Sequence, residues 1–272
     1  MQSIFSQIGD TPLIEVDVSD NASTDETPEV VRRYMETYSN LRYSRNDENL
    51  GPDPNILKLL DEARGLFIKL HGDDNYFVEN SIWPLLSLTR RNADCGLIHI
   101  NVLNGDGNVI RGEGAESYLG QISFAATYLP SLILRRADWH KIEDKTRFTG
   151  SWIIQFYFVL NLLCSTNPKF AIFNSVMFAS PPKSNEPREH TMGKVFIRNY
   201  LNILGHFVGR GLSEEAFKRD KHWLLHAYLM PQYEWNLRHF APEYTADVVE
   251  IFMECYKDEP YYPDTLAFQS VK

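Results

Sequence analysis

Two adjacent carboxylates, Asp73 and Asp74, carry the most specific chemistry in this sequence. They follow an apolar stretch, Ile-Lys-Leu-His-Gly, that predicts a short strand within residues 68–77. In open α/β sheets, ligands bind outside the carboxyl ends of the strands. Two carboxylates held there offer hard oxygen ligands to a divalent cation, which usually takes phosphate oxygens as well. The alternative interpretation is a solvated Asp-Asp turn, because aspartate is a common turn residue.

Two more polar loops precede this pair, and each follows an expected strand. One is residues 19–27, Ser-Asp-Asn-Ala-Ser-Thr-Asp-Glu-Thr, and the other is residues 45–54, rich in Asn, Asp, Gly and Pro. The expected strands lie at 13–18, 41–43 and 67–70, and the expected helices between them at 29–39 and 55–64. Such alternation predicts that these strands share one mostly parallel sheet with right-handed crossovers. We therefore expect all three polar loops at one edge of that sheet, where they would form a ligand crevice.

The composition limits the class of protein. The chain has 272 residues, 43% of them hydrophobic, and a formal net charge of −9, so a packed core is expected and a general nucleic-acid binder is not. Its three cysteines are scattered, which favours a reducing compartment. The longest apolar run, at 152–164, is too short to span a bilayer. We expect a cytoplasmic protein, with peripheral association at the inner face of the membrane as an open alternative.

The rest of the chain continues the α/β pattern and then becomes helical. Further strands are expected at 96–103, 131–134 and 170–178, helices at 78–88, 151–164, 195–208, 213–229 and 245–256, and a Pro-rich loop at 179–191. The prediction is an α/β fold with a mostly parallel sheet flanked by helices, divided into a nucleotide-sugar-binding and acceptor domain at 1–178 and a helical extension at 179–272.

Three segments together resemble a known family. The Ser-Asp-Asn loop at 19–21, the Asn-Leu-Gly-Pro-Asp-Pro-Asn segment at 49–55 and Gly-Asp-Asp-Asn at 72–75 are similar, in order and spacing, to family 2 glycosyltransferases of the GT-A fold. The form of residues 49–55 is closer to the branch that includes abequosyltransferases and other O-antigen sugar transferases. The resemblance covers roughly residues 1–136 and implies a GT-A-like, Rossmann-like sheet.

The resemblance also implies roles for individual residues. Asp20 would contact the nucleotide base, Asp73 the ribose, and Asp74, with Asp73, an Mn²⁺ or Mg²⁺ ion on the diphosphate. The substrate-binding residues implied are Asp20, Asn21, Asp53, Asn55 and Asp73. The family often has a further acid two positions before the pair. This chain has His71 there, which argues against a metal site built on three acids.

Two other departures from the family affect the functional prediction. The acidic general base that many members place near the helix expected at 151–164 has no direct counterpart, and Asp144 is the nearest candidate, with a solvated loop acid as the alternative. The family's first strand and its turn also have no counterpart, because residues 1–7 match the end of the first helix. Either the start is misplaced or the chain is a divergent or impaired member.

The resemblance implies transfer of a hexosyl or deoxyhexosyl group from a nucleotide-diphosphate donor to an acceptor hydroxyl. The expected partners are a nucleotide-sugar donor and a saccharide or lipid-linked acceptor, in surface polysaccharide or O-antigen assembly, with no nucleic acid. The alternative is a non-catalytic member that binds nucleotide or sugar, inactivated by loss of the first strand.

Overall fold

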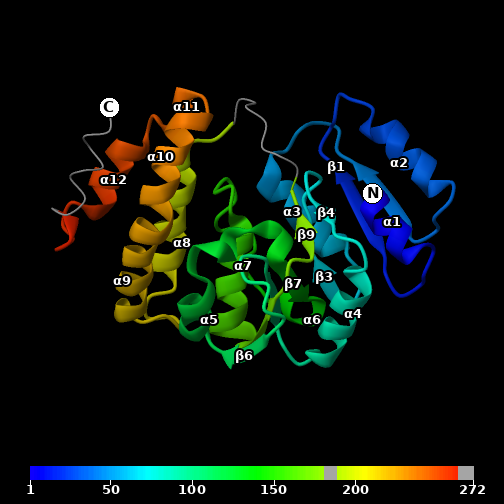
Figure 1. Ribbon diagram of the computed structural model, residues 1–272, viewed down its shortest axis with the longest axis horizontal. Coiled ribbons are helices and arrows are strands. Elements are labelled where there is room, and N and C mark those ends of the chain that lie inside the picture. Colours follow the sequence, from blue (N-terminus) through cyan, green and yellow to red (C-terminus); the bar gives the residue numbers. More distant parts are fainter. Residues whose placement is uncertain (181–188, 263–272) are drawn as a thin grey trace.

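The computed structural model describes residues 1–180 and 189–262. Figure 1 shows a pair of parallel strands with α1 and α2 at one end of the molecule, the main sheet and its helices in the middle, and the C-terminal helices at the other end. The expected α/β class, with a sheet flanked by helices and a helical C-terminal region, is confirmed.

The strands form three sheets. They are β1 (Val16–Asp20), β2 (Leu41–Arg45), β3 (Phe67–Lys69), β4 (Tyr76–Phe77), β5 (Leu97–Asn101), β6 (Val109–Glu113), β7 (Leu132–Arg135), β8 (Lys169–Asn174) and β9 (Phe178–Ala179). The main sheet has the order β3-β7-β5-β8-β6, and β1-β2 and β4-β9 are two-stranded. The strand expected at 170–178 is thus two strands, and neither β4 nor β6 was expected.

The prediction that the first three expected strands share one sheet is wrong. β1 and β2 pair in parallel, whereas β3 pairs only with β7, antiparallel, at the edge of the main sheet. Among the described residues, no strand pairs with both sheets, so β1 and β3 are not joined by backbone hydrogen bonds. Side-chain packing joins the two sheets instead.

The main sheet is mixed and not mostly parallel. β5 and β8 are parallel, β7 is antiparallel to both β3 and β5, and β6 is antiparallel to β8. It follows that β3, β5 and β8 run in one direction, with β7 and β6 opposite. The carboxyl ends of β3, β5 and β8 therefore lie at one edge, which is the edge at which ligands bind in such folds.

The helices start and stop at recognisable signals. Ser213 precedes α9, and its Oγ accepts a hydrogen bond from the N–H of Ala216 at 3.1 Å. Two acids follow in the first turn, and Lys221 and His222 lie in the last, so the charges complement the helix dipole. The α-helices are α1 (Gln2–Ile8), α2 (Thr27–Met35), α3 (Pro52–Glu62), α4 (Ile82–Arg91), α5 (Ala115–Ile122), α6 (Arg136–Trp139), α7 (Ile154–Asn161), α8 (Tyr200–His206), α9 (Glu214–Trp223), α10 (Met230–His239), α11 (Pro242–Thr245) and α12 (Val248–Tyr256).

Shorter helical segments connect or extend these helices. They are η1 (Ser123–Thr127), η2 (Leu129–Ser131), η3 (Leu162–Thr166), η4 (Lys194–Asn199) and η5 (Leu224–Leu229). Within the described ranges, no helix is long and apolar enough to cross a membrane. Of the Pro-rich loop expected at 179–191, residues 181–188 lie outside the described residues.

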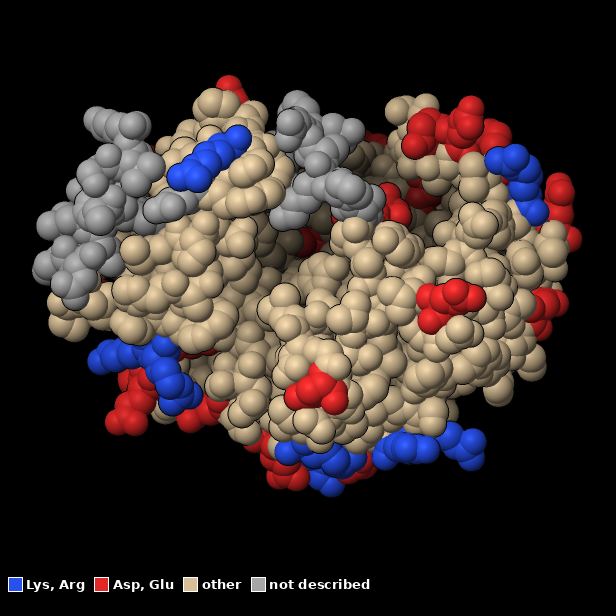
Figure 2. Space-filling model, in the orientation of Figure 1, with Lys and Arg blue, Asp and Glu red and all other residues tan. Residues whose placement is uncertain are grey.

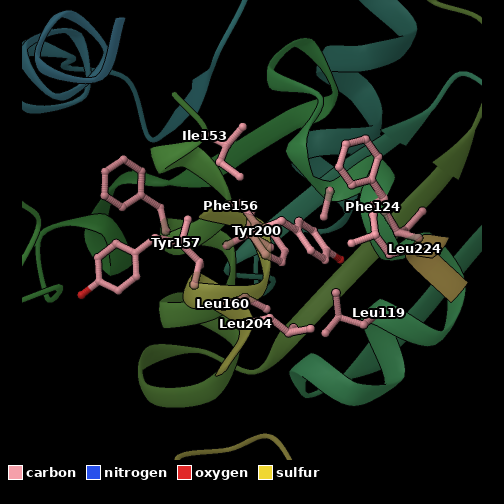
Figure 3. Close-up of a cluster of buried hydrophobic side chains, with 14 of the residues drawn as sticks. Leu119, Phe124, Ile153, Phe156, Tyr157, Leu160, Tyr200, Leu204 and Leu224 are labelled. Carbon is pink, nitrogen blue, oxygen red and sulfur yellow. The ribbon is translucent and has the colours of Figure 1, made fainter. Parts of the chain in front are cut away.

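The larger hydrophobic core runs without interruption from the main sheet into the C-terminal helices. It includes Leu97 and Leu134 of the sheet, Phe156 of α7, Tyr200 of α8 and Phe252 of α12, each essentially inaccessible to solvent. Figure 3 shows the part where α7, α8 and α5 meet, with Phe156 beside Tyr200. The predicted domain division at residue 178 stays a prediction, and the two parts share this core.

A second core joins the separate β1-β2 sheet to the main sheet. Phe5 and Ile8 of α1 pack in one buried cluster with Leu41 of β2, Phe77 of β4 and Ile98 of β5. The amphipathic helix α1 thus supplies apolar contacts between two sheets that share no backbone hydrogen bond.

Replacing Phe156 should test whether the sheet and the C-terminal helices form one cooperative unit. Its ring is fully buried and stacks on Tyr200 at 4.5 Å between centroids. Phe156→Ala should lower the free energy of unfolding by about 3–5 kcal/mol, because a cavity is left in the shared core. Met253→Ala, at a position 45% exposed on α12, should change it by less than about 0.5 kcal/mol. Urea unfolding monitored by fluorescence and circular dichroism would measure both, and a Phe156→Ala transition that affects only one signal would contradict the single unit.

Candidate functional site

Two of the three polar loops expected at one sheet edge, those after β1 and β2, meet, whereas the third follows β3 of the main sheet. Asp20 and Arg45 are the last residues of these paired strands. The Asn21 side chain donates to Asn49 Oδ1 at 2.8 Å and to the carbonyl of Gly51 at 3.1 Å. These bonds hold the two loops together at the carboxyl edge of the two-stranded sheet, where a ligand crevice was expected.

Asp20 is a buried carboxylate with a full set of donors around it. It is 3% exposed, and it accepts hydrogen bonds from the N–H of Ser23 at 2.7 Å and from the Tyr43 hydroxyl at 2.7 Å. The Nε of Arg45 lies 3.4 Å from Asp20 Oδ2. Burial alone would raise the pKa of Asp20, but the bonds from Tyr43 and Ser23 and the charge of Arg45 outweigh it and leave the pKa below its ordinary value. Asp20 therefore stays ionised and anchors both loops.

Asn21 and Asn55, two of the residues implied to bind substrate, are occupied by this network. The Asn21 carbonyl oxygen accepts from Asn46 Nδ2 at 2.9 Å and from the N–H of Leu50 at 3.0 Å, so both ends of its amide are used. Asn55 Oδ1 accepts from Ser19 Oγ at 2.6 Å and from Asn46 at 3.0 Å. Their geometry suits them to hold the loops in place, and direct substrate contact stays a prediction.

Asp53 lies beneath the crevice, inside the protein. It is 0% exposed, and its Oδ2 accepts from the N–H groups of Gly150 at 2.8 Å and Trp152 at 3.0 Å. Burial raises the pKa of Asp53 above its ordinary value, although these backbone donors oppose the shift. These donors occupy Asp53 Oδ2, and the expected substrate contact stays a prediction.

The paired acids Asp73 and Asp74 lie exposed in the turn between β3 and β4. The turn is held by Asn75, whose Nδ2 donates to Ser180 Oγ at 2.5 Å and to the Tyr128 hydroxyl at 3.3 Å. A Cβ at Gly72 would lie 2.8 Å from Asp74 Oδ1, so a larger residue there would displace the Asp74 side chain. The turn follows β3, at the edge where Asn101 of β5 and Asn174 of β8 bond to each other at 3.0 Å.

The donor set at this turn fits a cation only in part. His71 does not replace the missing third acid, because its ring stacks on Phe77 at 4.5 Å and its Nε2 lies 3.2 Å from the carbonyl oxygen of Asn75. Burial lowers the pKa of His71 to about 3. Throughout the described part of the chain, no three His, Cys, Asp or Glu side chains form a metal cluster. The two carboxylates would therefore hold Mn²⁺ or Mg²⁺ only together with ligands from a substrate.

The candidate base Asp144 is exposed and already paired. Its carboxylate lies 2.7 Å from Arg147, and its backbone carbonyl accepts from the Tyr157 hydroxyl at 2.8 Å. The ion pair engages the Asp144 carboxylate in this structure. The assignment of Asp144 as general base stays a prediction.

Sequence reasoning missed Lys69, the residue before the acidic turn on β3. Its Nζ donates to the carbonyl oxygens of Leu70, at 2.6 Å, and Pro130, and lies 4.8 Å from the ring centre of Phe178 and 5.6 Å from that of Phe77. Burial lowers the pKa of Lys69 to about 7. The sequence signal that could have identified it is a lysine inside the apolar run Phe-Ile-Lys-Leu. The Lys69 side chain contacts rings of β4 and β9 and so joins these strands to β3.

Figure 2 shows how these parts relate on the surface. The face seen there is hollowed between the C-terminal helices and the N-terminal third, and Asp and Glu side chains are visible inside the hollow. Figure 1 places the β1–β2 sheet and the C-terminal helices at opposite ends of the molecule, on either side of this hollow.

Replacing Tyr43 should show how much of the loop anchor depends on its bond to Asp20. Tyr43→Phe should cost about 1.5–3 kcal/mol of unfolding free energy near pH 7, the usual contribution of a hydrogen bond to a charged group. Because the pKa of folded Asp20 is lowered, the stabilisation is present above about pH 4 and is lost as the pH falls through the folded pKa.

Urea unfolding of the wild type and Tyr43→Phe at about pH 7 and about pH 3 would measure this difference. Tyr38→Phe is the matched control, since the Tyr38 ring stacks on Phe5 at 4.3 Å and should be little affected. An equal loss of stability at both pH values would contradict the assigned role of the charge.

Comparisons with known proteins identify a family that matches the N-terminal part of the chain. A family model described as glycosyl transferase family 2 matches residues 1–158, more than half of the chain. The abequosyltransferase RfbV of Salmonella typhimurium is 29% identical over 160 residues, which cover 51% of this chain and 48% of RfbV. The match therefore spans about half the length of that curated relative.

Solved structures resemble this chain in fold. TarS of S. aureus in complex with UDP-GlcNAc superposes with a TM-score of 0.58 at 16% identity, over 86% of this chain and 73% of TarS. The mannosyltransferase PcManGT of Pyrobaculum calidifontis, in complex with GDP-Man and Mn²⁺, superposes with a TM-score of 0.52 at 16% identity, over 97% of this chain and 77% of PcManGT. At these identities the similarity concerns the fold alone.

Proposed function

This chain belongs to glycosyl transferase family 2, and we propose on that basis that it transfers a sugar from a nucleoside-diphosphate donor to an acceptor hydroxyl. The observation that carries the proposal is the hydrogen-bonded pair of polar loops at the carboxyl ends of β1 and β2, held by Asp20 and Asn21. This is the position at which α/β sheets of this kind bind nucleotides.

Asp20 serves the donor through these loops. Its carboxylate is covered by Ser23, Tyr43 and Arg45, so it fixes the backbone of residues 20–23 and the guanidinium of Arg45 at the crevice edge. Rigid positioning of this kind lowers the entropy lost when a ligand binds. The structural neighbours TarS and PcManGT were solved with UDP-GlcNAc and GDP-Man, which supports a nucleotide-sugar donor.

Asp73 and Asp74 serve the diphosphate end of the donor. Asp73 and Asp74 are exposed in the turn between β3 and β4, which the side-chain hydrogen bonds of Asn75 hold. A bound Mn²⁺ or Mg²⁺ would offset the negative charge that develops on the leaving diphosphate. With only two acids present, Asp74 would be the principal protein ligand and Asp73 would face the ribose.

The acceptor follows from the relatives and not from any single contact. RfbV is named an abequosyltransferase, and the similarity over 160 residues supports transfer of a hexosyl or deoxyhexosyl group in surface polysaccharide or O-antigen assembly. A saccharide or lipid-linked acceptor fits this role. An acceptor carried on a lipid would place the reaction at the cytoplasmic face of a membrane.

The alternative is a module that binds nucleotide or sugar without transferring it. An assay of nucleoside diphosphate release distinguishes the transferase from the binding module. The protein is incubated with UDP-, GDP- and CDP-linked sugars, and release is measured with and without saccharide acceptors. Release that depends on the acceptor supports the transferase, whereas saturable donor binding with no release in any mixture supports the binding module.

Asp20→Asn should weaken binding of the best of UDP, CDP and GDP by at least about tenfold, because loss of the charge loosens the bonds to Arg45 and Ser23. Asp10→Asn is the matched control. Asp10 accepts similar bonds from Ser39 and Asn40, but just before the start of β2, so it lies at the opposite end of the same two strands. Calorimetric titration would measure both, and equal affinities for Asp20→Asn and the wild type would remove Asp20 from the donor site.

Metal dependence should rest on Asp74. Nucleoside diphosphate binding should be strengthened by millimolar Mn²⁺ or Mg²⁺, and Asp74→Asn should abolish that enhancement because an amide keeps the shape but not the charge. Asp73→Asn should retain most of the enhancement, and Glu79→Gln, an exposed acid after β4, should retain all of it. Titrations in chelator and in excess metal would test this, and equally tight binding in both conditions would leave the acidic pair as a turn only.

A further inference from the structure

Asp53 is a buried carboxylate that accepts hydrogen bonds from a turn outside its own helix. It lies in the first turn of α3, directly after the loop that Asn21 holds, yet its Oδ2 bonds to the N–H groups of Gly150 and Trp152 at 2.8 and 3.0 Å. The Ser151 hydroxyl is 3.4 Å from the same oxygen. One carboxylate oxygen thus organises a turn almost one hundred positions away in the sequence.

The turn that Asp53 holds has an unusual backbone. Gly150 has a φ of 91° and Trp152 a φ of 67°, and a tryptophan in the left-handed region is strained. The three donors to Asp53 come from this turn, so they stabilise a conformation that the local sequence disfavours. Helix α7 begins directly after the turn, at Ile154, and its position therefore depends on Asp53.

Hydrogen bonds continue from the turn into the C-terminal helices. The Ser151 carbonyl accepts from Asn199 Nδ2 at 3.0 Å, and Asn199 is the last residue of η4, directly before α8. On the other side, Asn21 holds Gly51, the residue before α3. A contiguous series of contacts thus runs from the β1–β2 loops through Asp53 and Ser151 to the helices on the far side of the hollow in Figure 2.

We infer that Asp53 is a positioning residue that transmits binding of a nucleoside diphosphate at the 46–55 loop to the 150–154 turn and, through Asn199, to the C-terminal helices. The inference rests on the proposed function, because it takes the 46–55 loop as part of the donor site. Binding that stiffens this loop restricts α3 at its first turn, and the carboxylate passes the restriction to the backbone that it holds.

Amide hydrogen exchange of the full chain, with and without UDP, CDP or GDP, tests the transmission. In the wild type, the nucleotide that binds should slow exchange at 150–154 and 194–206 by about fivefold or more, the lower range of coupling between sites. Asp53→Ala should remove this slowing when wild type and variant are each measured at a nucleotide concentration that saturates them. Asp53→Asn should restore it, because the amide oxygen can accept the same bonds from Gly150 and Trp152.

Asp61→Ala is the matched control on the same helix. Asp61 accepts from Trp139 Nε1 at 3.1 Å and Lys145 Nζ at 2.8 Å, so its loss disturbs α3 without touching the turn, and the slowing should persist. Should Asp53→Ala not fold, Asn199→Ala interrupts the series one contact later. It should keep the slowing at 150–154 and lose it at 194–206.

The outcomes separate this inference from the proposed function. The transmission alone would be overturned if nucleotide bound to the wild type without slowing exchange at 150–154. Full slowing of exchange in Asp53→Ala would also overturn it, and so would unchanged slowing at 194–206 in Asn199→Ala. Loss of detectable nucleotide binding in Asp53→Ala, restored by Asp53→Asn, would also overturn the transmission and make Asp53 part of the donor site. A wild type that binds none of the three nucleotides would overturn the proposed function itself.

Discussion

The structure depends on one continuous apolar core that extends from the main sheet into the C-terminal helices. Phe156 of α7 stacks on Tyr200 of α8, and both are shielded from solvent together with side chains of β5 and α12. Burial of this much apolar surface is the dominant favourable term in folding. It places the C-terminal helices at the opposite end of the molecule from the β1–β2 sheet, with the hollow of Figure 2 between them.

A second constraint is that the buried carboxylates Asp20 and Asp53 need donors, and most of these donors come from other segments of the chain. Asp20 takes them from the loop after β1 and from β2, and Asp53 takes them from the turn before α7. An unpaired buried charge would be costly, so each carboxylate fixes the backbone that satisfies it. The same groups thereby hold the candidate site together, so its geometry is linked to the stability of the fold.

The parts of the fold that follow from local pattern were predictable. Helices α3 and α9 carry apolar spacing and clear start signals, and most strands lie where apolar runs were seen. The β4 and β6 strands were not expected, because β4 has two residues and the pairing partner of β6 is β8, not its neighbour in sequence. The prediction of which strands share a sheet was also wrong, because strand pairing depends on contacts between segments that are distant in the sequence.

The sequence by itself determined the chemistry of the candidate site: acids and amides after three strands, in the order and spacing of a known family. Residue types and local order are written in the chain, and local propensity places strand ends near them. Only the tertiary structure decided their roles. It turned Asp53 inward, engaged both ends of the Asn21 amide, stacked His71 on Phe77 and put β3 in a different sheet from β1. Burial and hydrogen-bond partners are contributed by segments remote in sequence, so no local pattern could specify them.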